Sequence, residues 1–276
     1  MGCTLSPSLG KPSVDDIIRS RRQNRGAKGA FYALLFIMVV WSIKVTVIDD
    51  TDWERIGSLG KVLAAASRFI GIDFSLFPSL IGPTLETLMI ACLGTLVGVI
   101  LCIPAVWFGA HNITPYKPIT YPLARLMMTL SRSVHEIVWA LFFVAAVGLG
   151  ALAGVMALAV RSIGFIAKMS AEAIEDIDPG PVDAIRAAGG NDFQVMIYAV
   201  LPQVLPQVLS VIIFEWDINI RRSAILGMVG AGGLGLVFFR QMNTFNYHGV
   251  TSVIIAILLL ILLGEVLSYF ARKAVI

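Results

Sequence analysis

Long apolar runs separated by short polar stretches dominate this chain. A helix needs about 20 apolar residues to cross a bilayer. Four runs of that length occupy residues 30–48, 85–108, 196–214 and 250–269. A further apolar region, residues 124–171, is interrupted at 148–150 by the sequence Gly-Leu-Gly. The pattern predicts an all-α polytopic membrane protein.

The region 124–171 decides how many spans there are. One span over 137–160 gives five helices and places the basic C-terminal residues on the side opposite the basic N-terminus. A hairpin at 148–150 instead gives spans over 124–147 and 151–171. Lysine and arginine collect on the cytoplasmic side of a membrane. We therefore favour six transmembrane helices with both termini cytoplasmic.

Composition supports membrane insertion and excludes other classes. The chain of 276 residues is 57% hydrophobic and 14% charged, with a mean hydropathy of +0.84, whereas soluble domains are about a quarter charged. A net charge of +3 is too small to predict a nucleic-acid partner. The three cysteines and three histidines have neither disulfide-framework nor metal-site spacing.

A polar island at residues 177–203 separates two apolar regions. Its sequence Asp178-Pro179-Gly180-Pro181 ends a helix, because proline lacks the amide donor and clashes with the preceding turn. A short amphipathic segment at 182–188 follows, then two glycines and a new helix. The island predicts a helix-turn-helix at the membrane surface.

The same island carries a family motif. Permease subunits of binding-protein-dependent ABC importers have a loop of pattern E-A-A, three residues, G, nine residues, I, one residue, L-P. This chain keeps the spacing with Asp183-Ala184-Ile185, Gly189, Ala199 and Leu201-Pro202, although Asp183, Ile185 and Ala199 replace the family's residues. From about Thr84 onward the chain resembles these permeases. The flanking I-D-P-G-P-V-D-A-I-R-A-A-G and the run G-M-V-G-A-G-G-L-G at 227–235 are similar to the phosphonate branch.

The pattern of charged and apolar residues divides the first 83 residues, and the resemblance implies a permease domain with a set of coupling residues. We expect a cytoplasmic basic segment at 1–29, a first transmembrane helix at 30–48 and a periplasmic segment at 49–83, containing an interfacial helix at 56–70. Residues 84–276 would form a permease domain whose core resembles the five-helix type I ABC importer fold, with a cytoplasmic coupling loop at 172–195. The residues expected to contact the ATPase are Asp183, Ala184, Ile185, Arg186, Ala187, Gly189, Gly190, Leu201 and Pro202.

The resemblance also implies partners. They are a second copy of this permease, two ATP-binding subunits and a periplasmic solute-binding protein, assembled in the bacterial inner membrane. The sequence contains no G-x-x-x-x-G-K-[ST] motif, which cradles ATP phosphates. We expect this chain to bind no cofactor and to have no catalytic residue, with ATP and Mg²⁺ held by the partner ATPase.

Polar residues at membrane depth are costly and tend to face partners or a water-filled path. The candidates for the translocation path are Arg132, His135, Glu136, Arg161, Gln203, Gln207, Arg221, Arg222, Gly230, Gly232 and Gly233. The alternatives are structural. Arg132 and Glu136 could form an ion pair within one helix, and Gln203 and Gln207 could satisfy carbonyls freed by Pro202 and Pro206.

Two glycine patterns have plainer interpretations. Gly94 and Gly98 have the small-x-x-x-small spacing that lets helices approach closely, either for packing or along a pore. Gly230-x-Gly232-x-x-Gly235 matches a dinucleotide fingerprint, but no βαβ unit surrounds it. We expect the run to be a re-entrant or interfacial element beside the pore.

The function that we predict is transport of phosphonate or a related oxyanion such as phosphite or phosphate. Another small solute such as methionine remains open, because methionine permeases share the fold. An ion-coupled secondary transporter would need a midplane acidic site and often inverted repeats, neither of which is evident. A membrane-embedded enzyme would need a cluster of catalytic groups, for which His135 and Glu136 are insufficient.

Overall fold

The computed structural model describes residues 14–49 and 59–275, where the regular elements are helices and no strand occurs. The chain divides into two compact units, Met1–Ala65 and Ala66–Ile276. Five helices in the described ranges are long and apolar enough to cross a membrane, and a bent pair makes a sixth if it is one span. The predicted all-α membrane fold is confirmed. The expectations for residues 1–13 and 50–58 lie outside the described residues.

The first unit contains one long helix. Helix α1 (Val14–Ile43) continues as a π-helical turn, η1 (Lys44–Asp49). Its apolar part, Lys28–Asp49, has the length and hydropathy of a span and includes the predicted span at 30–48. A lipid-facing helix needs no protein partner for its apolar side chains. Helix α3 (Leu59–Ser67) then falls within the predicted interfacial helix at 56–70.

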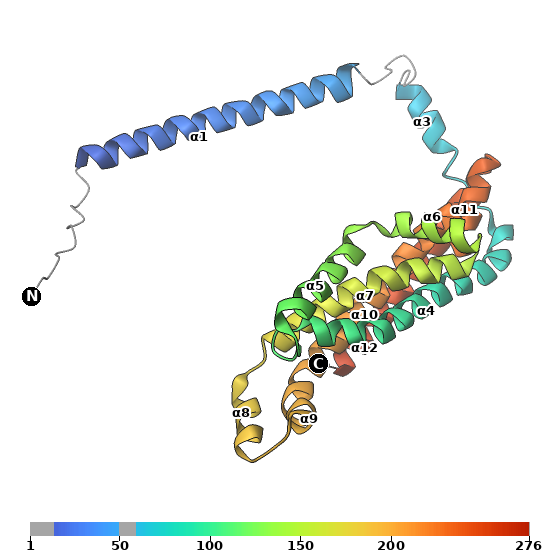
Figure 1. The fold of residues 1–276 in the computed structure, drawn as a ribbon. Coiled ribbons are helices and arrows are strands. Elements are labelled where there is room, and N and C mark those ends of the chain that lie inside the picture. The colour runs from blue at the N-terminus through green and yellow to red at the C-terminus, as the bar shows by residue number, and fades with distance from the viewer. Residues whose placement is uncertain (1–13, 50–58, 276) are drawn as a thin grey trace, which may run out of the picture. The chain divides into compact units, whose positions relative to one another are not determined.

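The second unit is a helical bundle (Figure 1). Its long helices are α4 (Phe77–Gly109), α7 (Ala151–Glu175), α10 (Leu201–Leu226) and α12 (Tyr247–Val275). The shorter ones are α5 (Lys117–Ser133), α6 (Glu136–Val147), α8 (Pro179–Ala187), α9 (Asp192–Val195) and α11 (Gly233–Asn243). Figure 1 shows α4, α7, α10 and α12 side by side, with α8 and α9 at one end and α6 and α11 toward the other.

Helix α7 is the centre of the bundle and packs against α4, α5, α6 and α10. It is rich in small buried residues, among them Ala153, Ala157 and Gly164, which let neighbouring backbones approach closely. On α4, a Cβ added at Gly94 would lie 2.7 Å from the Cβ of Leu158 on α7, and one at Gly98 would lie 2.6 Å from the Cβ of Ser162. The two glycines therefore form a packing contact within the chain.

The predicted hairpin at 148–150 is present, and the alternative single span over 137–160 is wrong. Gly148 and Gly150 have φ values of +98° and +142°, which disrupt a helix. The segment 124–147, however, is not one helix. Helices α5 and α6 are bent by 88°, because Val134 and His135 are extended between them. Polar residues flank this break, among them Arg132, Ser133 and Glu136, but the prediction placed all of them inside one span of 124–147.

Helix α10 is longer than predicted. It extends to Leu226, whereas the sequence pattern predicted an end at Phe214. Glu215, Asp217 and Asn219 were expected after the span, but they lie inside the helix and are buried. Helix α10 remains helical through this stretch because Glu215 and Asn219 find partners on neighbouring helices and Asp217 pairs with Arg221 on α10 itself.

We predict that Gly98→Ala destabilises the bundle. The added methyl group would overlap Ser162, and overpacking of this kind costs about 1–3 kcal/mol. Gly29→Ala is the matched control, because Gly29 is also helical but has no atom within 4 Å of an added Cβ. Thermal unfolding of the purified protein in detergent should show a lower midpoint for Gly98→Ala only. Equal midpoints for the two variants would contradict the tight α4–α7 contact.

Candidate functional site

Four buried polar side chains from three helices meet inside the bundle. They are Thr95 of α4, Ser162 of α7, and Glu215 and Asn219 of α10, each at most 4% exposed. The Asn219 amide donates to Thr95 Oγ1 at 2.9 Å and to Ser162 Oγ at 2.8 Å. The Ser162 hydroxyl donates to Glu215 Oε1 at 3.0 Å. Buried polar groups require such partners, so the network ties α4, α7 and α10 together.

Two arginines extend this network to the start of α6. Arg222 Nη1 donates to Glu215 Oε1 at 2.8 Å, and Arg222 Nε lies 3.5 Å from Glu136 Oε1. Arg161 Nε lies 3.2 Å from Glu136 Oε2. We call Glu136, Arg161, Glu215 and Arg222 the arginine–glutamate cluster. The charges of its two arginines and two glutamates sum to zero. Charged groups that are shielded from water need partners of opposite charge in this way.

The possible intrahelical pair between Arg132 and Glu136 is absent. Arg132 is in the last turn of α5, and α6 starts at an angle of 88° to α5. Residues four apart lie side by side only within one continuous helix, so Arg132 and Glu136 do not meet. Instead Arg161 Nη1 donates to the Arg132 carbonyl oxygen at 3.0 Å. In the described part of the chain no carboxylate pairs with the Arg132 side chain. His135 caps the N-terminus of α6, where its Nδ1 accepts from the Ile137 amide at 3.3 Å.

The sequence reasoning missed Thr95, Ser162, Glu215 and Asn219. A signal for part of the set existed, because residues 215, 219 and 222 are four and three apart. That spacing places them on one face of a helix. Arg221, also predicted for the path, lies off that face and pairs with Asp217 on its own helix at 2.5 Å.

The island at 177–203 folds as a short helix, a glycine turn and a new helix. The Asp178 carboxylate accepts from the Gly180 amide at 2.9 Å and so caps α8. The turn after α8 requires glycine, because Gly189 has a φ of +84°. The Gly190 amide donates to the Ile185 carbonyl oxygen at 3.0 Å and closes the turn.

Most of the predicted coupling residues face outward. Ile185 and Gly190 are partly buried, while the exposed ones are Asp183, Ala184, Arg186, Ala187, Gly189, Leu201 and Pro202. Ile185 packs against the apolar cluster of the bundle. The loop thus offers a surface of mostly small or apolar residues, with Asp183 and Arg186 as its charged groups, at the end of the bundle that carries α8 and α9 (Figure 1).

Two side chains, Gln203 and Glu175, anchor the ends of this loop. Gln203 on α10 accepts from the Asp178 amide at 3.0 Å and donates to the Ala199 carbonyl oxygen at 2.8 Å. At the end of α7, Glu175 accepts from Arg125 Nη2 on α5 at 2.7 Å and from the His111 amide after α4 at 2.7 Å. Gln203 therefore holds the loop, whereas Gln207, one turn later, is exposed.

The glycine run closes the bundle toward the end opposite α8. Gly230, Gly232 and Gly233 have φ values of +95°, +86° and +68°. Residues other than glycine rarely adopt this backbone conformation. The run folds onto α4, where the Leu234 amide donates to Thr87 Oγ1 at 2.8 Å. The Gly230 carbonyl oxygen accepts from the Gly150 amide at 2.9 Å. These contacts explain the glycines as a close-packed turn, and their role in a path stays a prediction.

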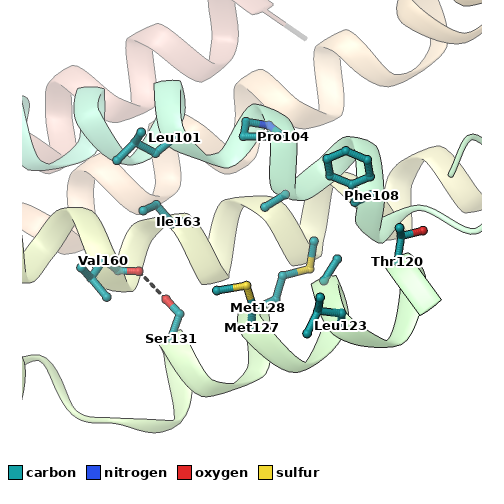
Figure 2. Close-up of a pocket in the computed structure, with 12 residues that line it drawn as sticks. Leu101, Pro104, Phe108, Thr120, Leu123, Met127, Met128, Ser131, Val160 and Ile163 are labelled. Atoms are coloured by element: carbon teal, nitrogen blue, oxygen red, sulfur yellow. Dashed lines mark hydrogen bonds between the residues drawn. The ribbon is translucent and has the colours of Figure 1, made fainter. Parts of the chain in front are cut away.

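An apolar pocket of about 560 Å³ lies between α4, α5 and α7. Figure 2 shows the side chains that line it, with the Ser131 hydroxyl directed at the Val160 carbonyl oxygen. The Thr120 hydroxyl donates to the Tyr116 carbonyl oxygen at 2.6 Å. Both lining hydroxyls are engaged and no lining residue is charged, so this pocket does not suit an anion.

Comparison with known proteins agrees with the loop motif. Residues 31–275 match the family described as the binding-protein-dependent transport system inner membrane component. The phosphite transport system permease protein PtxC of Stutzerimonas stutzeri is 38% identical over 83% of this chain and 82% of its own. The phosphate-import permease protein PhnE of Mycolicibacterium smegmatis is 33% identical over 96% of this chain and 49% of its own.

Solved structures agree on the fold. A chain of the inward-facing MetNI methionine ABC transporter superposes with a TM-score of 0.65, covering 74% of this chain and 100% of its own, at 21% identity. The bundle thus has the fold of type I ABC importer permeases. The resemblance inferred from the island and the glycine run is confirmed, and the chain belongs to the family of binding-protein-dependent transport system inner membrane components.

Proposed function

We propose that this chain forms the translocation pathway for phosphonate, phosphite or phosphate in an ATP-driven importer of the bacterial inner membrane. The observation that carries the proposal is the 38% identity to a phosphite permease over 83% of the chain. The bundle interior contains the kind of positive group that an anion needs in a low-dielectric region. Arg161 and Arg222 supply two guanidinium groups there, which Glu136 and Glu215 neutralise in this structure.

Energy for transport would come from a partner that binds ATP and Mg²⁺. The exposed α8 loop is suited to dock on such a subunit, because Ala184 and Ala187 allow close approach while Asp183 and Arg186 offer polar contacts. Closure of two ATPase subunits would then move α8 as a rigid body. The chain itself is a transporter subunit and not an enzyme.

The proposed assembly contains two copies of this permease, two ATPase subunits and a periplasmic binding protein. We place both termini and the loop at 172–195 in the cytoplasm. The last turn of α12 lies at the bundle end that carries α8 (Figure 1) and contains Arg272 and Lys273. Basic residues favour the cytoplasmic side, which supports this orientation.

The two loop anchors would transmit the motion of α8 into the bundle. Glu175 connects the end of α7 to α5 and to the segment after α4. Gln203 connects the start of α8 to α10. A displacement of α8 would therefore reach α4, α5, α7 and α10 together.

We predict that Gly189→Val uncouples ATP hydrolysis from transport. A β-branched residue is strained at a φ of +84°, so α8 would be misdirected. Gly189→Asn is the matched control, because asparagine tolerates the left-handed region. In proteoliposomes containing the ATPase and binding protein, phosphite uptake per ATP hydrolysed should fall several-fold in Gly189→Val and stay near wild type in Gly189→Asn. Normal uptake by Gly189→Val would rule out this role.

We predict that Gln203→Leu loosens α8. The substitution removes the acceptor of the Asp178 amide, and a lost hydrogen bond costs about 0.5–1.5 kcal/mol. Gln207→Leu is the control, since Gln207 lies one turn further along the same helix and is exposed. Hydrogen–deuterium exchange at residues 177–188 should accelerate about 2–10-fold in Gln203→Leu alone. Unchanged exchange in both variants would argue against the anchor.

We predict that phosphorus oxyanions stimulate the assembled transporter. ATP hydrolysis by the lipid-reconstituted complex should rise when the binding protein is loaded with phosphite, phosphate or a phosphonate, and should not rise with methionine. One relative named as a probable D-methionine transport system permease protein is 28% identical over 44% of the chain, so stimulation by methionine alone would assign that substrate instead. Flux that needs no ATPase would favour an ion-coupled transporter.

A further inference from the structure

We propose that Arg161 and Arg222 form a binding site for the transported oxyanion inside the bundle, and that the Glu136 carboxylate occupies this site in the present structure. The inference rests on the proposed function, because it names where a phosphorus oxyanion binds during passage. Glu136 would thus act as a tethered substitute for the substrate, and the substrate would displace it.

The position of the Glu136 carboxylate has the geometry of an oxyanion site. One oxygen lies 3.2 Å from Arg161 Nε and the other 3.5 Å from Arg222 Nε. The two guanidinium groups come from different helices and meet the two oxygens separately. A tetrahedral oxyanion presents a similar pair of oxygens along one edge. Glu136 is also the first residue of α6, and a helix N-terminus favours negative charge.

The contacts of Glu136 are weaker than those of Glu215. Charge-assisted hydrogen bonds are normally about 2.7–2.9 Å long, and Arg222 Nη1 reaches Glu215 Oε1 at 2.8 Å. All three contacts of Glu136 are longer, including one of 3.8 Å to His135 Nδ1. The buried Arg161 Nε lies 3.2 Å from Glu136 Oε2 but makes no hydrogen bond of good geometry. Glu215 therefore holds Arg222 in place. Glu136 is the exchangeable occupant, and an oxyanion with more oxygens can satisfy the free donor.

The bend between α5 and α6 lets Glu136 leave. It follows directly after the extended Val134 and His135, so its movement breaks no continuous helix. Arg132, in the last turn of α5, has no carboxylate partner among the described residues and lies four positions earlier in the chain. The 88° bend keeps Arg132 and Glu136 apart in this structure, so rotation of the Glu136 side chain about the break would bring its carboxylate toward Arg132 and keep the charges balanced when an oxyanion enters.

The depth of the site identifies the ligand as a free oxyanion and not a lipid headgroup. Arg161 is ten residues after Ala151, the first residue of α7, which corresponds to about 15 Å along the helix axis. The hydrocarbon core of a bilayer is about 30 Å thick. Arg161 is therefore near the middle of α7, a helix of 25 residues with the length of a span, and headgroup phosphates do not reach the middle of a spanning helix.

The test measures binding of radiolabelled phosphite to the permease purified with its ATPase subunits, in nanodiscs of phosphatidylcholine and without the binding protein. A tethered competitor that fills the site about 90% of the time weakens apparent affinity about tenfold. Glu136→Gln should therefore bind phosphite about tenfold more tightly than wild type, and adding Arg161→Gln should abolish the gain. Glu172→Gln is the control, because Glu172 is on the same helix as Arg161 but its carboxylate pairs with Arg125 and Lys168. It should match wild type.

The outcomes separate this inference from the proposed function. A gain in Glu136→Gln that is lost with Arg161→Gln supports the site. No gain, in a variant whose thermal midpoint matches wild type, overturns it. An equal gain in Glu172→Gln also overturns it, because the effect would then be non-specific. If Glu136→Gln does not fold, Glu136→Asp serves, since the shorter carboxylate cannot reach both arginines. ATPase stimulation by phosphite-loaded binding protein, measured in parallel on wild type, tests the proposed function alone.

Discussion

A charge inside a membrane bundle must be matched by an opposite charge, and here Arg222 serves two carboxylates at once. It donates to Glu215 at 2.8 Å on its own helix and lies 3.5 Å from Glu136 on α6. Arg161 completes the balance from α7. Removing Glu215 would leave the buried Arg222 with only its longer contact to Glu136, which is strongly destabilising. The relative positions of α6, α7 and α10 therefore depend on these ion pairs.

Close packing of small residues allows those pairs to form. Gly94 and Gly98 let α4 approach α7 until an added Cβ would overlap Leu158 or Ser162. Thr95, between the two glycines, is then near enough for the Asn219 amide to reach its hydroxyl at 2.9 Å. Apolar packing has little driving force between helices in lipid. The combination of close backbone approach and buried hydrogen bonds is what holds this interior together.

Local rules made much of the fold and of the coupling loop predictable. Two glycines with positive φ end the helix before α7, and Asp178 followed by proline starts α8. Gly189 was expected at a turn and has the backbone conformation that favours glycine. Such features depend on residues adjacent in the chain, so a sequence reveals them. The break at Val134 and His135 was missed because no proline or glycine marks it, and the polar residues around it, such as Arg132 and Glu136, were placed inside one span.

The sequence by itself determined that this chain is a helical membrane protein with a polar loop of permease type, since apolar run length and turn residues are local properties. Only the tertiary structure decided which charges meet. Glu136 pairs with Arg161 and Arg222 and not with Arg132, which is closer in the sequence. Gln203 holds the start of α8. These contacts depend on helix bending and on the approach of residues far apart in the chain. Hydrophobic periodicity indicates which face of a helix is buried, but not which residue of another helix packs against that face.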